Sequence, residues 1–74
     1  MDKENIGKMP SNYIKAEMKR KGLFAKDMIK LLKDYDENLN LQSFHNKISR
    51  GNFSAVFFFK CMYALDIKTV RLED

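Results

Sequence analysis

Apolar residues recur at the three- and four-residue spacing of a helix in four successive parts of the chain. The spacing predicts helices over residues 12–21, 25–34, 41–50 and 55–65. The first three have a polar side opposite an apolar stripe formed by Ile14 and Met18, by Met28, Leu31, Leu32 and Tyr35, and by Leu41, Phe44 and Ile48. The fourth segment, AVFFFKCMYAL, is apolar nearly all the way round, so it must be buried on more than one side.

Turn-forming residues separate these segments. Ser11 and Asn12 follow Pro10, which predicts that the first helix begins there, because their side chains accept free amide hydrogens of a first turn. Gly22 and Gly51 are expected to end the first and third helices in a left-handed conformation. Asn40 is placed to cap the third helix, and Asn52 or Ser54 to start the fourth.

These elements predict one all-α domain, a bundle of four to five helices over residues 11–74, preceded by a flexible segment over residues 1–10. In the tail, Ile67, Val70 and Leu72 are compatible with a short C-terminal strand or with a last helical turn. The chain has 74 residues, and so small a core often gains further burial by pairing. We expect a monomer or a homodimer.

Basic residues are concentrated in one part of the chain. The whole chain has a formal net charge of +4, whereas residues 15–33 alone hold seven lysines and arginines against two acidic residues, a net charge of +5. A one-sided positive field attracts polyanions, nucleic acid first and an anionic membrane surface second. A solvated helix face is the alternative explanation.

Other classes of protein find little support. The chain has no apolar run long enough to span a membrane, and residues 1–10 lack the apolar stretch of a signal peptide, so we expect a cytoplasmic protein that binds no membrane. Cys61 is the only cysteine and lies in an apolar segment without a basic partner one turn away, which is typical of a buried, inert thiol. We expect no enzymatic activity, no metal and no cofactor.

The order of parts resembles the phage-repressor (Xre-type, lambda-repressor-like) helix-turn-helix superfamily. A Lys21-Gly22-Leu23 corner precedes the second helix, Arg50-Gly51 ends the third, and Ala64-Leu65-Asp66-Ile67 follows the fourth. The stretch Asn46 to Phe58 is similar to a group of small bacterial domains that share an NKISRGxFSxxFF signature. The resemblance implies a helix-turn-helix fold in which the helix over residues 41–50 enters the major groove of DNA.

The chain departs from that superfamily in two places. Phe24 and Ala25 stand where the repressors have Thr-Gln, whose glutamine touches a phosphate, so this phosphate contact is absent or passes to Lys26. The turn between the second and third helices is longer than usual and contains Asp34, Asp36 and Glu37. Carboxylates that faced the duplex would repel its phosphates.

A recognition helix needs donors and acceptors that reach base edges. Gln42, Ser43, Asn46 and Lys47 meet that need and are the candidate base contacts. The candidate phosphate contacts are Lys21, Lys26, Arg50 and Asn52. The resemblance singles out the Asn46-Lys47 and Arg50-Gly51 pairs.

Structural roles are the alternative for several of these residues. Asn46 could hydrogen-bond locally, Arg50 could pair with Asp36, and Gly51 could serve only the corner. For His45, a local hydrogen bond at a partly buried position and a contact to a base or phosphate are equally compatible with its position.

The apolar fourth helix predicts an interface. Consecutive helical residues point about 100° apart, so a core of this size does not easily cover three successive phenylalanines. We expect Phe57, Phe58, Phe59, Met62 and Tyr63 to form a dimer interface, the alternative being a core helix with one aromatic exposed.

Two functions follow from these observations. The favoured prediction is a DNA-binding protein, a transcriptional regulator that reads duplex DNA with residues 41–50 and pairs through its fourth helix and the tail. The alternative is a protein-interaction module that keeps the helix-turn-helix fold without binding DNA and uses the aromatic helix and the acidic turn to hold a partner.

Overall fold

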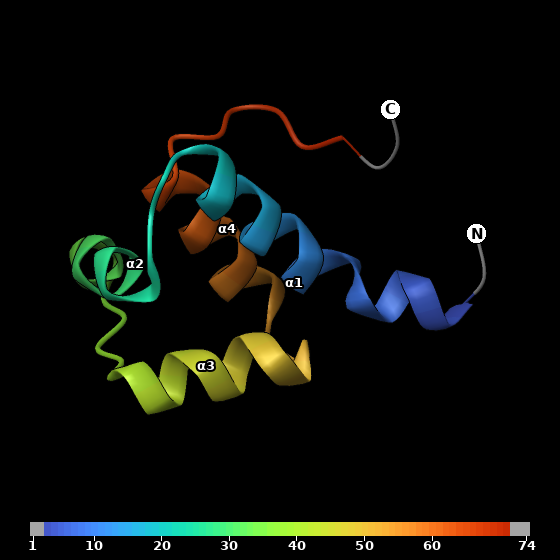
Figure 1. The fold of residues 1–74 in the computed structure, drawn as a ribbon, viewed down its shortest axis with the longest axis horizontal. Coiled ribbons are helices and arrows are strands. Elements are labelled where there is room, and N and C mark those ends of the chain that lie inside the picture. The colour runs from blue at the N-terminus through green and yellow to red at the C-terminus, as the bar shows by residue number, and fades with distance from the viewer. Residues whose placement is uncertain (1–2, 72–74) are drawn as a thin grey trace.

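The described part of the chain folds into four α-helices and one short 3-10 helix (Figure 1). The computed structural model describes residues 3–71, and this part of the chain contains no strand. The α-helices are α1 (Lys3–Arg20), α2 (Ala25–Leu32), α3 (Leu41–Arg50) and α4 (Ala55–Ala64), and the 3-10 helix is η1 (Lys33–Tyr35). The expected all-α fold is confirmed.

The helices pack around α4. It contacts α1 and α2, and α2 in turn contacts α3, which forms one edge of the molecule (Figure 1). The core contains residues from all four helices and from the end of α4: Ile14, Met28, Leu32, Phe44, Ile48, Phe57, Cys61, Met62 and Leu65. The apolar stripes predicted from the sequence supply most of these residues. Leu41 is an exception, since at the first turn of α3 it stays about half exposed.

The caps predicted for α3 and α4 are present. The Asn40 side chain accepts a hydrogen bond from the Ser43 amide at 2.7 Å, and Ser54 accepts one from the Phe57 amide at 3.0 Å. Each bond satisfies a free amide of a first helical turn. The expected left-handed glycines are also present, with φ of +68° at Gly22 and +66° at Gly51.

The predicted start of the first helix is wrong. Helix α1 begins at Lys3 instead of Asn12, so residues 3–10, expected to be flexible, are helical and Pro10 lies inside the helix. Proline lacks the amide that would close its helical turn and tends to bend a helix, and Figure 1 shows α1 bending before it enters the bundle. Burial beyond that bend explains why the helix continues, because Ser11 and Ile14 are both buried.

Helix α1 is tied to the end of α3. The buried hydroxyl of Ser11 donates a 2.7 Å hydrogen bond to the carbonyl of Ile48, one of the last-turn carbonyls of α3. Gly51, just after α3, packs closely against α1, because a Cβ there would lie 3.1 Å from Ser11 Oγ and 3.5 Å from the carbonyl oxygen of Gly7. Residues 7–11 therefore belong to the packed domain.

The connection between α2 and α3 is longer than a tight turn and contains η1. Asp36 ends η1 in the left-handed conformation, with φ of +64°, and the amide of Glu37 returns to the carbonyl of Leu32 at 3.1 Å. Glu37 Oε1 lies 3.2 Å from Lys60 Nζ on α4. The connection is thereby held against α4.

The described part of the tail is neither strand nor helix. After a turn at Asp66, with φ of +58°, residues 67–71 run along α1, where the Tyr13 hydroxyl donates to the carbonyl of Thr69 at 3.4 Å. Leu72, the last of the apolar tail positions, lies outside the described residues. Within residues 3–71, no helix is long and apolar enough to cross a membrane.

Candidate nucleic-acid interface

The outward side of α3 is polar and uncharged except for one arginine. Phe44 and Ile48 are buried and define the inward side. At 100° per residue, Asn46 points the opposite way, and Gln42 and Arg50 lie within about 40° of it. All three are exposed, and α3 contains no acidic residue. This ridge presents hydrogen-bond donors and acceptors to solvent.

The side chains of Gln42 and Asn46 interact with each other on the surface of α3. Gln42 Nε2 lies 3.4 Å from Asn46 Oδ1, one helical turn away, which is a long and therefore weak hydrogen bond. An exposed amide pair of this kind remains available to other hydrogen-bonding partners, and amide side chains can bond two atoms of an adenine at once. The alternative of a local hydrogen bond for Asn46 is thus present in a weak form.

A polar depression runs along one flank of that ridge. Its volume is about 300 Å³. It brings together four of the predicted DNA contacts in α3 and one in the following loop. The lining residues are Leu39, Ser43, Asn46, Lys47, Arg50 and Asn52. Arg50 makes no ion pair with any described residue, so the alternative pairing with Asp36 does not form.

Lys47 is directed differently from its neighbours. Its ammonium lies 5.0 Å from the centroid of the Phe57 ring, and the residue is half-buried. A cation over an aromatic face is attracted by the ring's electrons, by about 0.5–1 kcal/mol at exposed sites and more where water is excluded. In this structure Lys47 therefore stabilises the junction of α3 and α4, and the assignment of Lys47 to a base contact requires a different rotamer.

His45 lies on the other flank of α3 and is exposed. Its ring is edge-on to Phe44, with centroids 6.2 Å apart, and it borders an apolar pocket formed with α1 and α2. Of the two alternatives for His45, the partly buried position is therefore not what the structure shows.

The predicted phosphate contacts are not all on one side of the molecule. Arg50 lies on the ridge and Asn52 follows it in the next loop, and Lys26 is exposed in the first turn of α2, the helix that packs against α3. Lys21 borders a different depression, with Ile67, Thr69 and Arg71. Figure 1 shows this end of α1 across the molecule from α3, so the structure does not bring Lys21 to the ridge.

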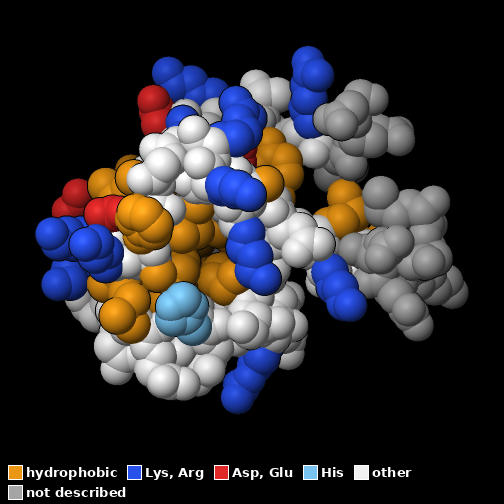
Figure 2. Space-filling model, viewed as in Figure 1, with side chains coloured by type: hydrophobic (Ala, Val, Ile, Leu, Met, Phe, Trp, Pro, Cys, Tyr) orange, Lys and Arg blue, Asp and Glu red, His pale blue; other side chains and the backbone are white. Residues whose placement is uncertain are grey.

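Neighbouring carboxylates neutralise part of the charge. Arg20 Nη1 lies 2.7 Å from Oε1 of Glu17, a buried residue, which removes one cation from the basic stretch. Glu37, in the acidic connection between α2 and α3, forms an ion pair with Lys60. Asp34 and Asp36 remain exposed in that connection. Figure 2 shows, on one face of the molecule, an apolar area that is bordered by Lys and Arg side chains on the right and by acidic side chains on the left.

The expected dimer interface is partly wrong. Phe57 and Met62 are 2% and 3% exposed and belong to the core, since the residues of α4 that point toward α1 and α2 are covered within one copy. Phe58 is half-buried, with its ring 6.3 Å from that of Tyr13. Phe59 and Tyr63 are 55% and 69% exposed and remain on the surface.

Cys61 offers no reactive thiol. It is fully buried, and burial, followed by the charge of Glu37, raises its pKa from 9.0 to about 12, against the opposing effect of Lys47. A thiol with so high a pKa stays protonated at neutral pH and is a poor nucleophile. Among the described residues, no three His, Cys, Asp or Glu side chains are grouped so that they could hold a metal ion.

Sequence reasoning missed the apolar pocket beside His45. Its lining residues come from three helices, and the helix predictions did not bring Lys15 and Phe24 together with α3. One signal was present in the sequence: Phe24 is a large aromatic residue directly before the predicted second helix. An aromatic residue at that position indicates an apolar surface there.

Comparison with known proteins gives a family and no activity. No curated protein and no solved structure matches the chain significantly. The sequence pattern of one family, described as a domain of unknown function (DUF6471), matches residues 7–70, from the part of α1 that contacts Gly51 to the described tail. The protein therefore belongs to the DUF6471 family.

Proposed function

We propose that this domain binds duplex DNA and acts as a transcriptional regulator, with α2, the connection and α3 forming a helix-turn-helix whose α3 enters the major groove. Gln42 and Asn46 read bases, with Ser43 beside them. Arg50, Asn52 and Lys26 hold the flanking phosphates. Lys47 joins the base contacts in a different rotamer, in which its ammonium leaves the Phe57 ring.

One observation carries the proposal: the exposed ridge of α3 is made of amide and guanidinium side chains, with no carboxylate on the helix and no ion pair at Arg50 among the described residues. Such groups at the first turns of a helix suit the major groove, which presents acceptors and donors on base edges. The Glu37–Lys60 pair also supports the proposal, because it removes one carboxylate charge from the lengthened connection.

The test is selection of bound duplexes from a random pool by the purified protein at near-physiological salt, where attraction by charge alone is suppressed. We expect enrichment of a short motif, and a palindrome if two copies bind together. Recovery of unenriched sequences at every round would contradict a sequence-reading role.

Variants locate the contact surface. Replacing Gln42 or Asn46 with alanine should reduce discrimination among bases by about 1–3 kcal/mol for each residue replaced. Asn12→Ala is the matched control, because it removes another exposed amide, from α1. Equal losses in the control and in the α3 variants would place the interface elsewhere.

We also propose that the exposed side of α4 is a protein-binding face that pairs two copies of the chain. Val56, Phe59 and Tyr63 are spaced three and four residues apart on this helix and are 63%, 55% and 69% exposed. Tyr63 stacks on Tyr35 of η1, with centroids 6.2 Å apart, which extends the apolar area. Exposed apolar groups at helical spacing are typical of a helix that packs against a partner.

Sedimentation equilibrium tests the pairing. A Phe59→Ser, Tyr63→Ser variant should be monomeric, whereas Phe24→Ser, which removes another strongly exposed aromatic outside α4, should remain dimeric. A monomeric unmodified protein contradicts the homodimer. If that monomer lacks duplex binding and copurifies with a stoichiometric second protein, the alternative function as a protein-interaction module is favoured.

A further inference from the structure

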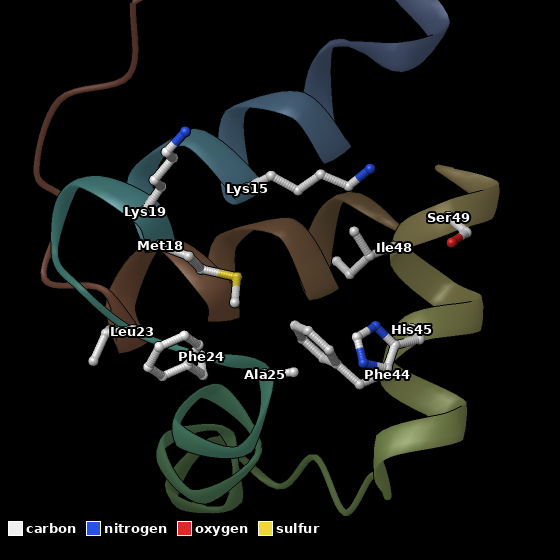
Figure 3. Close-up of a pocket in the computed structure, with 10 residues that line it drawn as sticks. All are labelled: Lys15, Met18, Lys19, Leu23, Phe24, Ala25, Phe44, His45, Ile48 and Ser49. Carbon is white, nitrogen blue, oxygen red and sulfur yellow. The ribbon is translucent and has the colours of Figure 1, made fainter.

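An apolar pocket of about 450 Å³ opens between α1, α2 and α3 (Figure 3). Phe44 and Ile48 of α3, both buried, form its floor with Met18. Leu23, Phe24 and Ala25 border it at the start of α2, and Figure 3 shows Phe24 on the side opposite His45. The pocket is therefore closed on three sides by three different helices or their ends.

Phe24 is exposed to an extent that the fold does not require. It is 70% exposed, yet its ring borders the pocket, and its main chain alone performs the local structural role. Its amide donates to Asp27 Oδ2 at 2.8 Å and its carbonyl accepts the first helical bonds of α2. Any residue other than proline would permit those bonds, so the aromatic ring is free to contribute apolar surface to the pocket.

The rim of the pocket is basic. Lys15 extends from α1 toward Ile48 and Ser49 of α3, whereas the ammonium of Lys19 points away from the pocket (Figure 3). His45 and Ser49 add hydrogen-bonding groups on the α3 side. None of the ten described residues that line the pocket is acidic, and neither lysine forms an ion pair with a described residue. Figure 2 shows an apolar area beside the histidine, with blue side chains along its right-hand side and acidic side chains at its left edge.

We propose that this pocket binds a small amphipathic carboxylate, with its apolar part on Met18, Phe24 and Phe44 and its carboxylate at Lys15, His45 and Ser49. The volume lies at the lower end of the range of about 300–1,000 Å³ that is typical of small-molecule sites, which favours a small ligand over a helix of a partner protein. An apolar floor with a few convergent polar groups is the usual composition of such a site. This binding does not depend on the proposed reading of DNA.

Decanoate is a suitable probe, titrated into the 74-residue chain below its micelle-forming concentration and followed by amide chemical shifts. We expect saturable shifts that are centred on Met18, Phe24 and His45. Decyltrimethylammonium, of equal chain length and opposite charge, should bind at least several-fold more weakly. Shifts centred on Phe59 and Tyr63, or equal binding of both probes, would overturn the proposal.

A pair of variants separates the pocket from the overall charge. Lys15→Gln should weaken decanoate binding by about twofold to fivefold, the range expected for removing one exposed ion pair. Lys30→Gln makes the same change of charge on an exposed residue outside the pocket and should leave the dissociation constant unchanged. Equal effects of the two variants would show that decanoate responds to net charge, which would overturn the assignment to this pocket.

Discussion

Gly22 and Gly51 share a left-handed backbone but differ in their surroundings. Nothing lies within 4 Å of a Cβ built at Gly22, whereas a Cβ at Gly51 would lie 3.1 Å from Ser11 Oγ. The first position therefore needs glycine only for its backbone, and the second also needs it for the approach of α1 to α3.

Replacing each glycine with alanine should reveal this difference. Gly22→Ala should lower the free energy of unfolding by about 1 kcal/mol, the cost of a left-handed conformation. Gly51→Ala should cost about 1 kcal/mol more, because the new methyl group displaces the hydroxyl that bonds to Ile48. Urea unfolding of both variants measures the two values. Equal costs would mean that α1 shifts at no cost in stability.

Cys61 makes stability depend on pH in the alkaline range. Its folded pKa is raised from 9.0 to about 12, so above pH 9 the unfolded chain loses a proton that the folded protein keeps. Stability should therefore fall between pH 9 and 12, by up to about 1.4 kcal/mol for each pH unit. The fall should be smaller in Cys61→Ala, in which only other groups titrate. Parallel pH profiles for the two proteins would contradict this account.

At the scale of single residues, the sequence predicts the chemical character of a surface better than the direction in which each side chain points. It indicates that Lys47 is a cation on the polar helix, but its position over Phe57 depends on how α4 packs against α3. It also shows three successive phenylalanines without showing which one faces inward, since that depends on the rotation of α4. Gln42 and Asn46 were predictable as exposed, because the apolar stripe of α3 fixes its inward side.

At the scale of elements, α1 is joined to α3 through Ser11. This residue is 5% exposed, and its hydroxyl satisfies a carbonyl at the end of α3 that has no helical partner of its own. The bond joins residues that are 37 positions apart in the sequence. Helix α3 is therefore held at its end by α1 as well as by the packing of its apolar stripe.

Ser11→Ala should destabilise the domain by about 1–2 kcal/mol, because it leaves a buried carbonyl without its donor. Asn12→Ala, at the exposed neighbouring position, should change stability by less than about 0.5 kcal/mol. Thermal unfolding of the two variants, followed by circular dichroism, tests the difference. A Ser11 variant as stable as the Asn12 variant would show that water replaces the hydroxyl.

Element boundaries were predictable where a side chain or glycine ends the helix locally. Asn40 and Gly51 gave both ends of α3 correctly, and Ser54 gave the start of α4. The start of α1 was mistaken because Pro10 next to Ser11 and Asn12 has the composition of a helix start. Long-range burial of Ser11 and Ile14, which a local pattern does not reveal, keeps this stretch helical. The second helix was predicted slightly long because its last residues form η1.

At the scale of the whole molecule, the net charge overstates the charge available at α3. Arg20 is paired with Glu17, Lys60 with Glu37, and Lys21 lies near the tail. Two exposed cations remain near α3. Arg50 lies on the ridge, and Lys26 lies in the first turn of α2. The salt dependence of DNA binding should thus reflect a small number of phosphate contacts.

Arg50→Ala should lower the slope of log affinity against log salt by about 1, because one fewer phosphate is neutralised. Lys33→Ala, which removes an exposed cation from η1, should leave the slope unchanged. Fluorescence anisotropy with a selected duplex at several salt concentrations gives both slopes. Equal reductions would indicate that a diffuse field, and not the ridge, attracts the DNA.

The complete burial of Cys61 also gives the protein a native reporter of its own opening. The chain has one cysteine, and its side chain is closed off from solvent, so a thiol-specific reagent modifies the protein only while α4 is transiently uncovered. The ratio of the modification rate to that of the unfolded chain measures the open fraction. Any molecule that binds the closed form slows this reaction, so a single native sulfur atom could register occupancy of the α3 ridge and of the apolar pocket without an attached label.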